Sequence, residues 1–146
     1  MNAIDFLIKE HNKVRKLLTD ISDKSHHYET KRTMFESLGN DLIRHETMEH
    51  KVWYPHFKND RRLNEEVRHL VKEENFAEQE IKKLSKITTE SAWNERFTQL
   101  KKDIEHHAKE EENQLFPEVK KLLTEDDLEK IGSEMYQFKK NYRLSS

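Results

Sequence analysis

Two stretches of the chain carry the same arrangement of potential metal ligands. His45 is followed by Glu49 and His107 by Glu111, and in each stretch a proline stands ten residues after the histidine. Residues four apart on a helix lie one turn apart on the same face, so each pair can offer an imidazole nitrogen and a carboxylate oxygen to one cation. Because the chain has only two prolines, their matched positions indicate a true internal repeat.

The spacing His-x-x-x-Glu occurs twice more, and those two copies lack the proline. They are His69 with Glu73 and His106 with Glu110. The upstream residues of the repeat agree with the register that pairs His45 with His107: Leu38 matches Leu100, Asp41 matches Asp103, and Leu42 matches Ile104. The register therefore selects His107 over its neighbour His106.

The elements that must position these residues are helices. Apolar side chains recur with helical periodicity, and the scarcity of glycine and proline disfavours a sheet with many hairpins. Thr124, followed by Asp127 three residues later, is a typical helix start. The pattern predicts an all-α fold, a four-helix bundle running up-down-up-down with an additional short C-terminal helix. The expected helices span residues 5–24, 30–57, 64–88, 91–123 and 125–143.

Polar residues interrupt the apolar stripes of these helices. An unpaired buried carboxylate costs several kcal/mol, and a buried imidazole also needs partners. A cation would neutralise the carboxylates and engage the imidazole nitrogens. We therefore predict that the following residues meet at one level of the bundle as metal ligands: His11, His45, Glu49, Glu74, His107 and Glu111.

The chemistry of these ligands limits which metal ions can bind. The chain has no cysteine, so nitrogen and carboxylate ligands favour iron, manganese or zinc. Glu49 and Glu111, one from each repeat, are suited to bridge two ions, as in other carboxylate-rich bundles. A pair of ions is thus favoured over a single structural zinc.

The chain resembles the hemerythrin-like, or HHE cation-binding, domains from residue 5 to residue 123. The matching segments are 8–14, 45–55 and 107–117. The resemblance implies a non-haem di-iron centre, with two iron ions bridged by carboxylates and an oxo or hydroxo group. His11, His45 and His107 would be nitrogen ligands, and Glu49 and Glu111 the bridges. Some members also use the carboxylate after the second helix's histidine, here Glu46.

The third helix departs from the family pattern, because Glu74 stands where a histidine is usual. Either Glu74 replaces the imidazole as a ligand, or the second metal position is weak, differently occupied or lost. The remaining histidines, His26, His27, His50 and His56, are expected on the surface, and His106 outside the ligand set. Trp53, Tyr54, Leu115 and Phe116 are expected to pack the end of the bundle.

Composition limits the partners. A net charge of −2 with interspersed signs gives no basic footprint for nucleic acid, and no segment reads as a signal peptide or membrane span. The absence of cysteine suits a reducing compartment. We expect a single cytoplasmic domain over residues 1–146, either a monomer or a homodimer, with a diatomic molecule or peroxide as its ligand.

The resemblance leads to one functional expectation and several alternatives. The expected protein binds or senses dioxygen, peroxide or nitric oxide, or handles iron in stress response. The alternatives are a peroxide-decomposing di-iron enzyme, an iron–sulfur cluster repair protein, and a metal-stabilised interaction bundle without catalysis. The family's repair proteins often carry an additional cysteine-bearing segment, so the lack of cysteine disfavours that alternative.

Overall fold

The computed structural model describes residues 1–142, and these contain helices and short connections but no strand. The predicted all-α class is confirmed. The observed α-helices are α1 (Ala3–Ile21), α2 (Tyr28–Met48), α3 (Asn64–Leu84), α4 (Glu90–Glu110), α5 (Phe116–Leu122) and α6 (Glu125–Asn141). Residue 143, the expected end of the last helix, lies outside the described residues.

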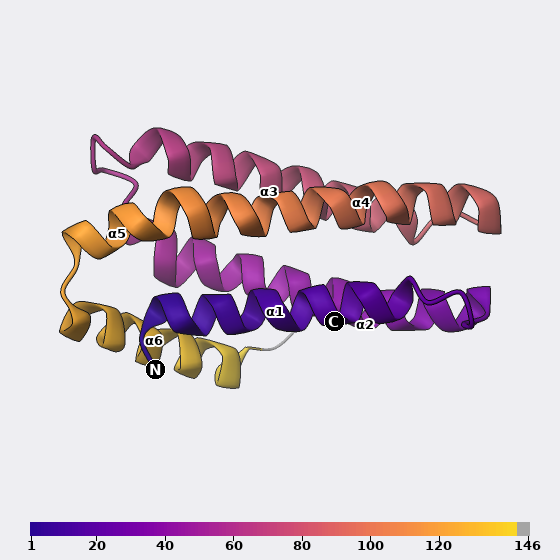
Figure 1. Cartoon of the computed structure of the whole chain (residues 1–146), viewed down its shortest axis with the longest axis horizontal. Coiled ribbons are helices and arrows are strands. Elements are labelled where there is room, and N and C mark those ends of the chain that lie inside the picture. Colours follow the sequence, from indigo (N-terminus) through magenta and orange to yellow (C-terminus); the bar gives the residue numbers. More distant parts are fainter. Residues whose placement is uncertain (143–146) are drawn as a thin grey trace.

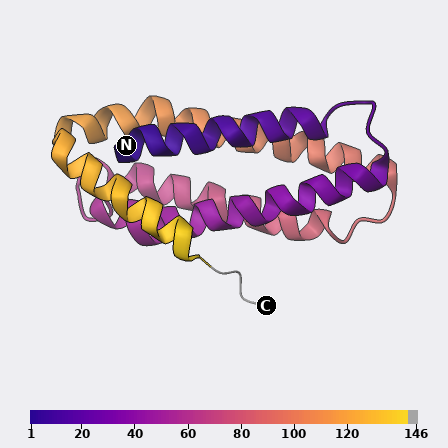
Figure 2. The ribbon, with the colours of Figure 1, turned by 90° about the horizontal axis from the view of Figure 1, so that it is seen from below.

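The first four α-helices form the bundle, with successive helices antiparallel (Figure 1). Helix α5 prolongs α4, and α6 then folds back along α1 and the end of α2 (Figures 1 and 2). This is the predicted four-helix bundle with an additional C-terminal helix. None of the helices in residues 1–142 is long and apolar enough to cross a membrane.

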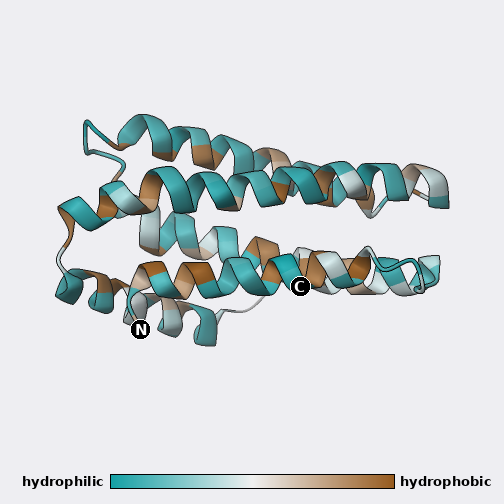
Figure 3. Ribbon diagram, viewed as in Figure 1, coloured by the Kyte–Doolittle hydropathy of each residue, from teal (hydrophilic) through white to brown (hydrophobic). Residues whose placement is uncertain are grey.

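The apolar core is divided into two clusters. One fills the end that α6 covers and includes Trp53, Leu115 and Met135, and the other fills the opposite end around Leu38 and Trp93. The apolar side chains form narrow stripes along otherwise hydrophilic helices (Figure 3). The polar residues predicted as ligands belong to neither cluster, so a charged layer interrupts the bundle core.

The two repeats contain a structural feature that the sequence did not predict. Each passes through one π-helical segment, Glu49–Trp53 and Glu111–Leu115. The backbone N–H of Tyr54 donates to the carbonyl oxygen of Glu49, and that of Phe116 to the carbonyl oxygen of Glu111, so each bond reaches back five residues instead of the four of an α-helix. Pro55 and Pro117 lie just beyond these segments, and proline clashes with the carbonyl four residues earlier. A wide turn relieves that clash, and such turns are frequent at functional sites.

Local signals at the helix ends behave as expected. Thr124 and Asp127 form a reciprocal capping box at the start of α6, which confirms the predicted start of this helix. Asn2 caps α1 through a hydrogen bond that its side chain accepts from the N–H of Asp5. Both caps lie at the same end of the bundle, where α6 meets the start of α1.

Gly132 provides a test of this contact. A Cβ atom there would overlap the carbonyl oxygen of Met1 and lie 2.9 Å from the carbonyl carbon of Asn2. We expect Gly132→Ala to destabilise the protein by about 1–3 kcal/mol, lowering Tm by about 2–8 °C, despite the better helix propensity of alanine. Thermal unfolding followed by circular dichroism measures the shift.

Gly39→Ala is the matched control. Its Cβ would meet the Cγ2 atom of Ile81 at 3.2 Å, and a side chain can move where the backbone near Gly132 cannot. This variant should keep its Tm within about 2 °C of the parent protein. Equal Tm values for both variants would mean that the start of α1 is not packed tightly on α6.

Candidate metal centre

The four bundle helices bring all six predicted ligand residues to one level. Two groups of side chains each have ligand atoms within 4.8 Å of one another, and Glu111 belongs to both. The first group is His11, His45 and Glu111, and the second is Glu49, Glu74, His107 and Glu111. Metal coordination by these residues stays a prediction, but the convergence that it requires is present.

The side of the centre at His11 and His45, here called the first half, contains a buried ligand atom without a hydrogen bond, and so do Glu49 and Glu111 between the two sides. Glu49 and Glu111 have no exposed surface. The Nε2 atom of His45 lies 2.7 Å from Oε1 of Glu49 and that of His11 lies 3.3 Å from Oε1 of Glu111. Yet both oxygens of Glu49, Oε1 of Glu111 and Nε2 of His11 lack a hydrogen-bond partner within residues 1–142. Such atoms fit a cation, because leaving them unpaired costs free energy.

The second half of the centre, the side at His107 and Glu74, is different, because the polar atoms of these two residues already have partners. Nε2 of His107 lies 2.9 Å from Oε2 of Glu74, and Nε2 of His50 lies 2.8 Å from Oε1 of the same carboxylate. The Tyr54 hydroxyl lies 2.7 Å from both Glu74 Oε2 and Glu111 Oε2. One hydroxyl hydrogen cannot fully satisfy both carboxylates. The two halves are therefore chemically unequal.

Each imidazole of the centre has an outer carboxylate at its other nitrogen. For His11 and His107 a hydrogen bond to this carboxylate fixes the tautomer and directs Nε2 inward, whereas Nδ1 of His45 lies too far from Glu10 for a hydrogen bond. The Nδ1–carboxylate distances are 2.7 Å for His11 and Glu112, 3.7 Å for His45 and Glu10, and 3.0 Å for His107 and Glu73.

Two of these outer carboxylates are held in turn by cations. Arg15 donates to both oxygens of Glu112, at 2.9 and 3.1 Å, and Lys139 on α6 donates to Glu10 at 2.7 Å. Burial opposes ionisation of Glu10, but His45 and Lys139 hold its pKa at about 2. The outer layer is therefore charged and fixed before any ion is added.

Electrostatics divides the inner carboxylates. Burial, reinforced by the charges of Glu111 and Glu74, raises the pKa of Glu49 well above its usual range. Burial also opposes ionisation of Glu111, but contact with His11 and Glu49 holds its pKa below the usual range. Burial and the neighbouring charges thus favour the protonated form of Glu49 in the metal-free centre, and a cation would take the place of that proton.

Helices α1 and α3 also share a short sequence motif. Leu7–Asn12 reads Leu-Ile-Lys-Glu-His-Asn and Leu70–Asn75 reads Leu-Val-Lys-Glu-Glu-Asn. Only His11 and Glu74 differ in chemical character. In the structure they occupy corresponding places, since Glu10 faces His45 as Glu73 faces His107.

The residues that contact His11 and Glu74 also differ in type between the two sides of the centre. His11 contacts Glu112, and Glu74 contacts His50. Glu112 directly follows Glu111, as His50 directly follows Glu49. On the first side, α1 supplies the imidazole (His11) and the repeat after α4 supplies the carboxylate (Glu112). On the second side, α3 supplies the carboxylate (Glu74) and the repeat after α2 supplies the imidazole (His50).

Two sequence expectations need correction on this point. His50 is not a free surface residue, because its imidazole is only 35% exposed and contacts Glu74. Tyr54 packs at the bundle end as expected, but its hydroxyl also reaches the carboxylates. Comparing Leu7–Asn12 with Leu70–Asn75 would have pointed to His50, because an exchanged residue needs an exchanged partner. Tyr54 differs from its repeat counterpart Phe116, which stacks on His11 instead.

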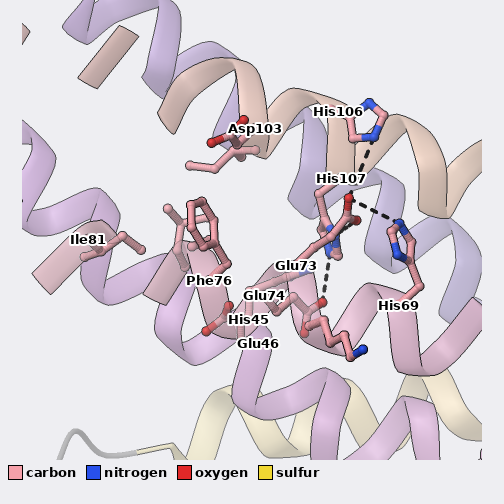
Figure 4. Close-up of a pocket in the computed structure, with 14 residues that line it drawn as sticks. His45, Glu46, His69, Glu73, Glu74, Phe76, Ile81, Asp103, His106 and His107 are labelled. Atoms are coloured by element: carbon pink, nitrogen blue, oxygen red, sulfur yellow. Dashed lines mark hydrogen bonds and ion pairs between the residues drawn. The ribbon is translucent and has the colours of Figure 1, made fainter. Parts of the chain in front are cut away.

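A cavity of about 420 Å³ opens onto the second half of the centre between α2, α3 and α4. Figure 4 shows Glu74 and His107 at its inner side, with the exposed Phe76 among its lining residues. Glu46 also lines it and belongs to neither ligand group. The apolar part of its wall is formed by Leu42, Ala77, Ile81 and Ile104.

The fold and the site together define a helical bundle with a carboxylate- and imidazole-rich centre. The sequence model of the hemerythrin HHE cation binding domain matches residues 2–119, and the chain belongs to this family. Metal binding is therefore the function that the family shares with this protein. No curated protein and no solved structure matches the chain significantly.

The contact between His50 and Glu74 predicts what happens when these two residues are interchanged. His50→Glu sets two carboxylates against each other, and Glu74→His sets two imidazoles against each other. We expect each single variant to weaken binding at the second metal position by about tenfold or more. The double variant His50→Glu/Glu74→His should recover to within about threefold, because it reproduces the His11–Glu112 arrangement. Metal titration of the metal-free proteins measures both effects.

His56→Glu controls for the added charge, since His56 is exposed on the same segment. It should leave affinity unchanged. Additive losses in the double variant would show that His50 and Glu74 do not act as a pair.

Glu46 predicts a pH dependence for the metal-free protein. Burial, followed by the charges of Glu74 and Glu78, raises its pKa to about 9. The folded carboxyl stays neutral while the unfolded one ionises, so its contribution to stability falls between about pH 4.5 and pH 9. Glu46→Gln should stabilise the chelator-treated protein by about 1–3 kcal/mol at pH 7 and leave it unchanged below pH 4. Tm measured against pH, with the exposed Glu36→Gln as control, checks this.

Proposed function

We propose that the protein holds a di-iron centre and uses it to bind or sense a small ligand, either dioxygen, peroxide or nitric oxide. The observation that carries the proposal is the group of buried, hydrogen-bond-free atoms on Glu49, Glu111 and His11. An interaction bundle without metal would instead need a Lys or Arg against these carboxylates. Within residues 1–142, imidazoles are their only ion-pair partners within 4.0 Å.

In this proposal each half of the centre would hold one ion. His11 and His45 would hold the first, and His107 and Glu74 the second, with Glu49 and Glu111 between them. Iron with an open coordination position would supply reversible binding or redox chemistry toward the small ligand. Nε2 of His11 has no hydrogen-bond partner within residues 1–142, whereas Nε2 of His107 already contacts Glu74, and this difference favours stronger binding in the first half.

The protein's own groups would then control the ligand's surroundings. The buried Tyr54 hydroxyl can donate to Oε2 of either Glu74 or Glu111, and so supplies a hydrogen at the middle of the centre. The apolar wall of the cavity limits water beside Glu74 and His107. The cavity is large enough to admit a diatomic molecule or peroxide from between α2, α3 and α4.

Metal analysis of protein purified without an affinity tag tests the proposal. We expect about two irons per chain, and a visible charge-transfer absorption that changes on exposure to oxygen. Glu49→Gln/Glu111→Gln should lose both irons and show a lower Tm, because no metal then stabilises the folded state. Glu74→Gln should keep about one iron, held in the first half.

Glu36→Gln serves as the matched control, because it removes the same charge from an exposed site on α2. It should retain the iron content and spectrum of the parent protein. Fewer than one iron per chain in the parent, with no such absorption, would overturn the di-iron proposal. Turnover of hydrogen peroxide by the iron-loaded protein would favour the enzyme alternative over sensing.

A further inference from the structure

Two of the four His-x-x-x-Glu pairs take no part in the buried centre. They are His69 with Glu73 on α3 and His106 with Glu110 on α4. The two helices bring them face to face, and three of these residues form a compact group of potential ligand atoms. We propose that His69, Glu73, His106 and Glu110 form a second metal site, for a single divalent cation of the zinc class.

The distances between the facing atoms match ligands that share an ion. Nε2 of His69 lies 2.8 Å from Oε1 of Glu110 and 3.5 Å from Oε2 of Glu73. Nε2 of His106 lies 3.4 Å from Oε2 of Glu110 and 3.7 Å from Oε2 of Glu73. Tetrahedral ligands at about 2.0–2.2 Å from zinc lie roughly 3.3–3.6 Å apart. Three of the four separations are close to that value and too long for good hydrogen bonds.

A second observation supports a cation site at this position. Glu110 is only 9% exposed, and its buried Oε2 atom has no hydrogen-bond partner within residues 1–142. Oε1 of Glu66, one turn away on α3, is also buried without a partner in the described chain. The charges of Glu73 and Glu66 act on Glu110 and, after its own burial, help to raise its pKa. This side of the bundle therefore gathers three carboxylates, those of Glu66, Glu73 and Glu110.

The composition of the site selects the kind of cation. Two imidazoles and two carboxylates without thiolate suit zinc and comparable divalent transition ions, whereas calcium and magnesium prefer oxygen ligands alone. His69 and His106 are 52% and 70% exposed, so a cation can reach the site directly from solvent.

Glu73 connects this outer site to the buried centre. Its Oε1 atom lies 3.0 Å from Nδ1 of His107, while Oε2 faces the two outer imidazoles. Figure 4 shows Glu73 between His69, His106 and His107 on the wall of the cavity. The outer site nevertheless uses ligand atoms that the buried centre leaves free, so each can bind without the other.

The test is a calorimetric titration with Zn²⁺ of the full chain carrying Glu49→Gln/Glu111→Gln, which removes the two bridging carboxylates of the buried centre. We expect one equivalent of Zn²⁺ per chain to remain. Adding His69→Gln/His106→Gln should weaken that equivalent by at least tenfold. NMR spectra should show that Zn²⁺ shifts the ring signals of His69 and His106.

His26→Gln/His27→Gln is the matched control, because it removes two neighbouring imidazoles from the loop between α1 and α2. It should leave the Zn²⁺ equivalent unchanged. No binding in the parent background, equal binding after His69→Gln/His106→Gln, or loss in the loop control would each overturn the outer site. None of these results depends on whether the buried centre holds iron, so the two proposals can fail separately.

Discussion

The structure depends on one electrostatic constraint, the burial of two carboxylates that no Lys or Arg accompanies in the described part of the chain. Glu49 and Glu111 lie completely inside the bundle, between two apolar clusters that could not tolerate free charges. A proton on Glu49 and contact with imidazoles reduce the cost but leave atoms unpaired. A bound cation would satisfy these atoms and would thereby couple the folding energetics of the bundle to metal binding.

The repeat explains how one chain builds such a centre. Each half contributes a histidine, a glutamate one turn later, a widened turn and a proline, and the odd helices supply a second matching phrase. The halves differ where His11 corresponds to Glu74 and Glu112 to His50. Since both members of the pair change together, the number of imidazole–carboxylate contacts is conserved while their direction is reversed. The result is a centre whose two sides contain the same kinds of group in different arrangements.

Much of this could be predicted from the sequence. The spacing of His45, Glu49, His107 and Glu111 placed them on inward helix faces, and the matched prolines identified the register. The contacts that His50 and the Tyr54 hydroxyl make with carboxylates of the centre were not predicted, because the π-helical turn shifts the residues after Glu49 around the helix axis, out of ideal periodicity. The outer carboxylates were missed for a different reason. Glu10 and Glu112 lie on polar faces, where helical periodicity does not distinguish a partner of a ligand from a solvated side chain.

Helix α6 begins after the segment that matches the family, yet it is joined to the centre. Lys139 binds Glu10, and Glu10 faces the outer nitrogen of His45. Displacing this helix would uncover the apolar cluster beneath it and withdraw a positive charge from the support of an inner imidazole. The C-terminal helix therefore contributes, through Glu10, to the electrostatic surroundings of His45, although it lies outside the bundle that contains the centre.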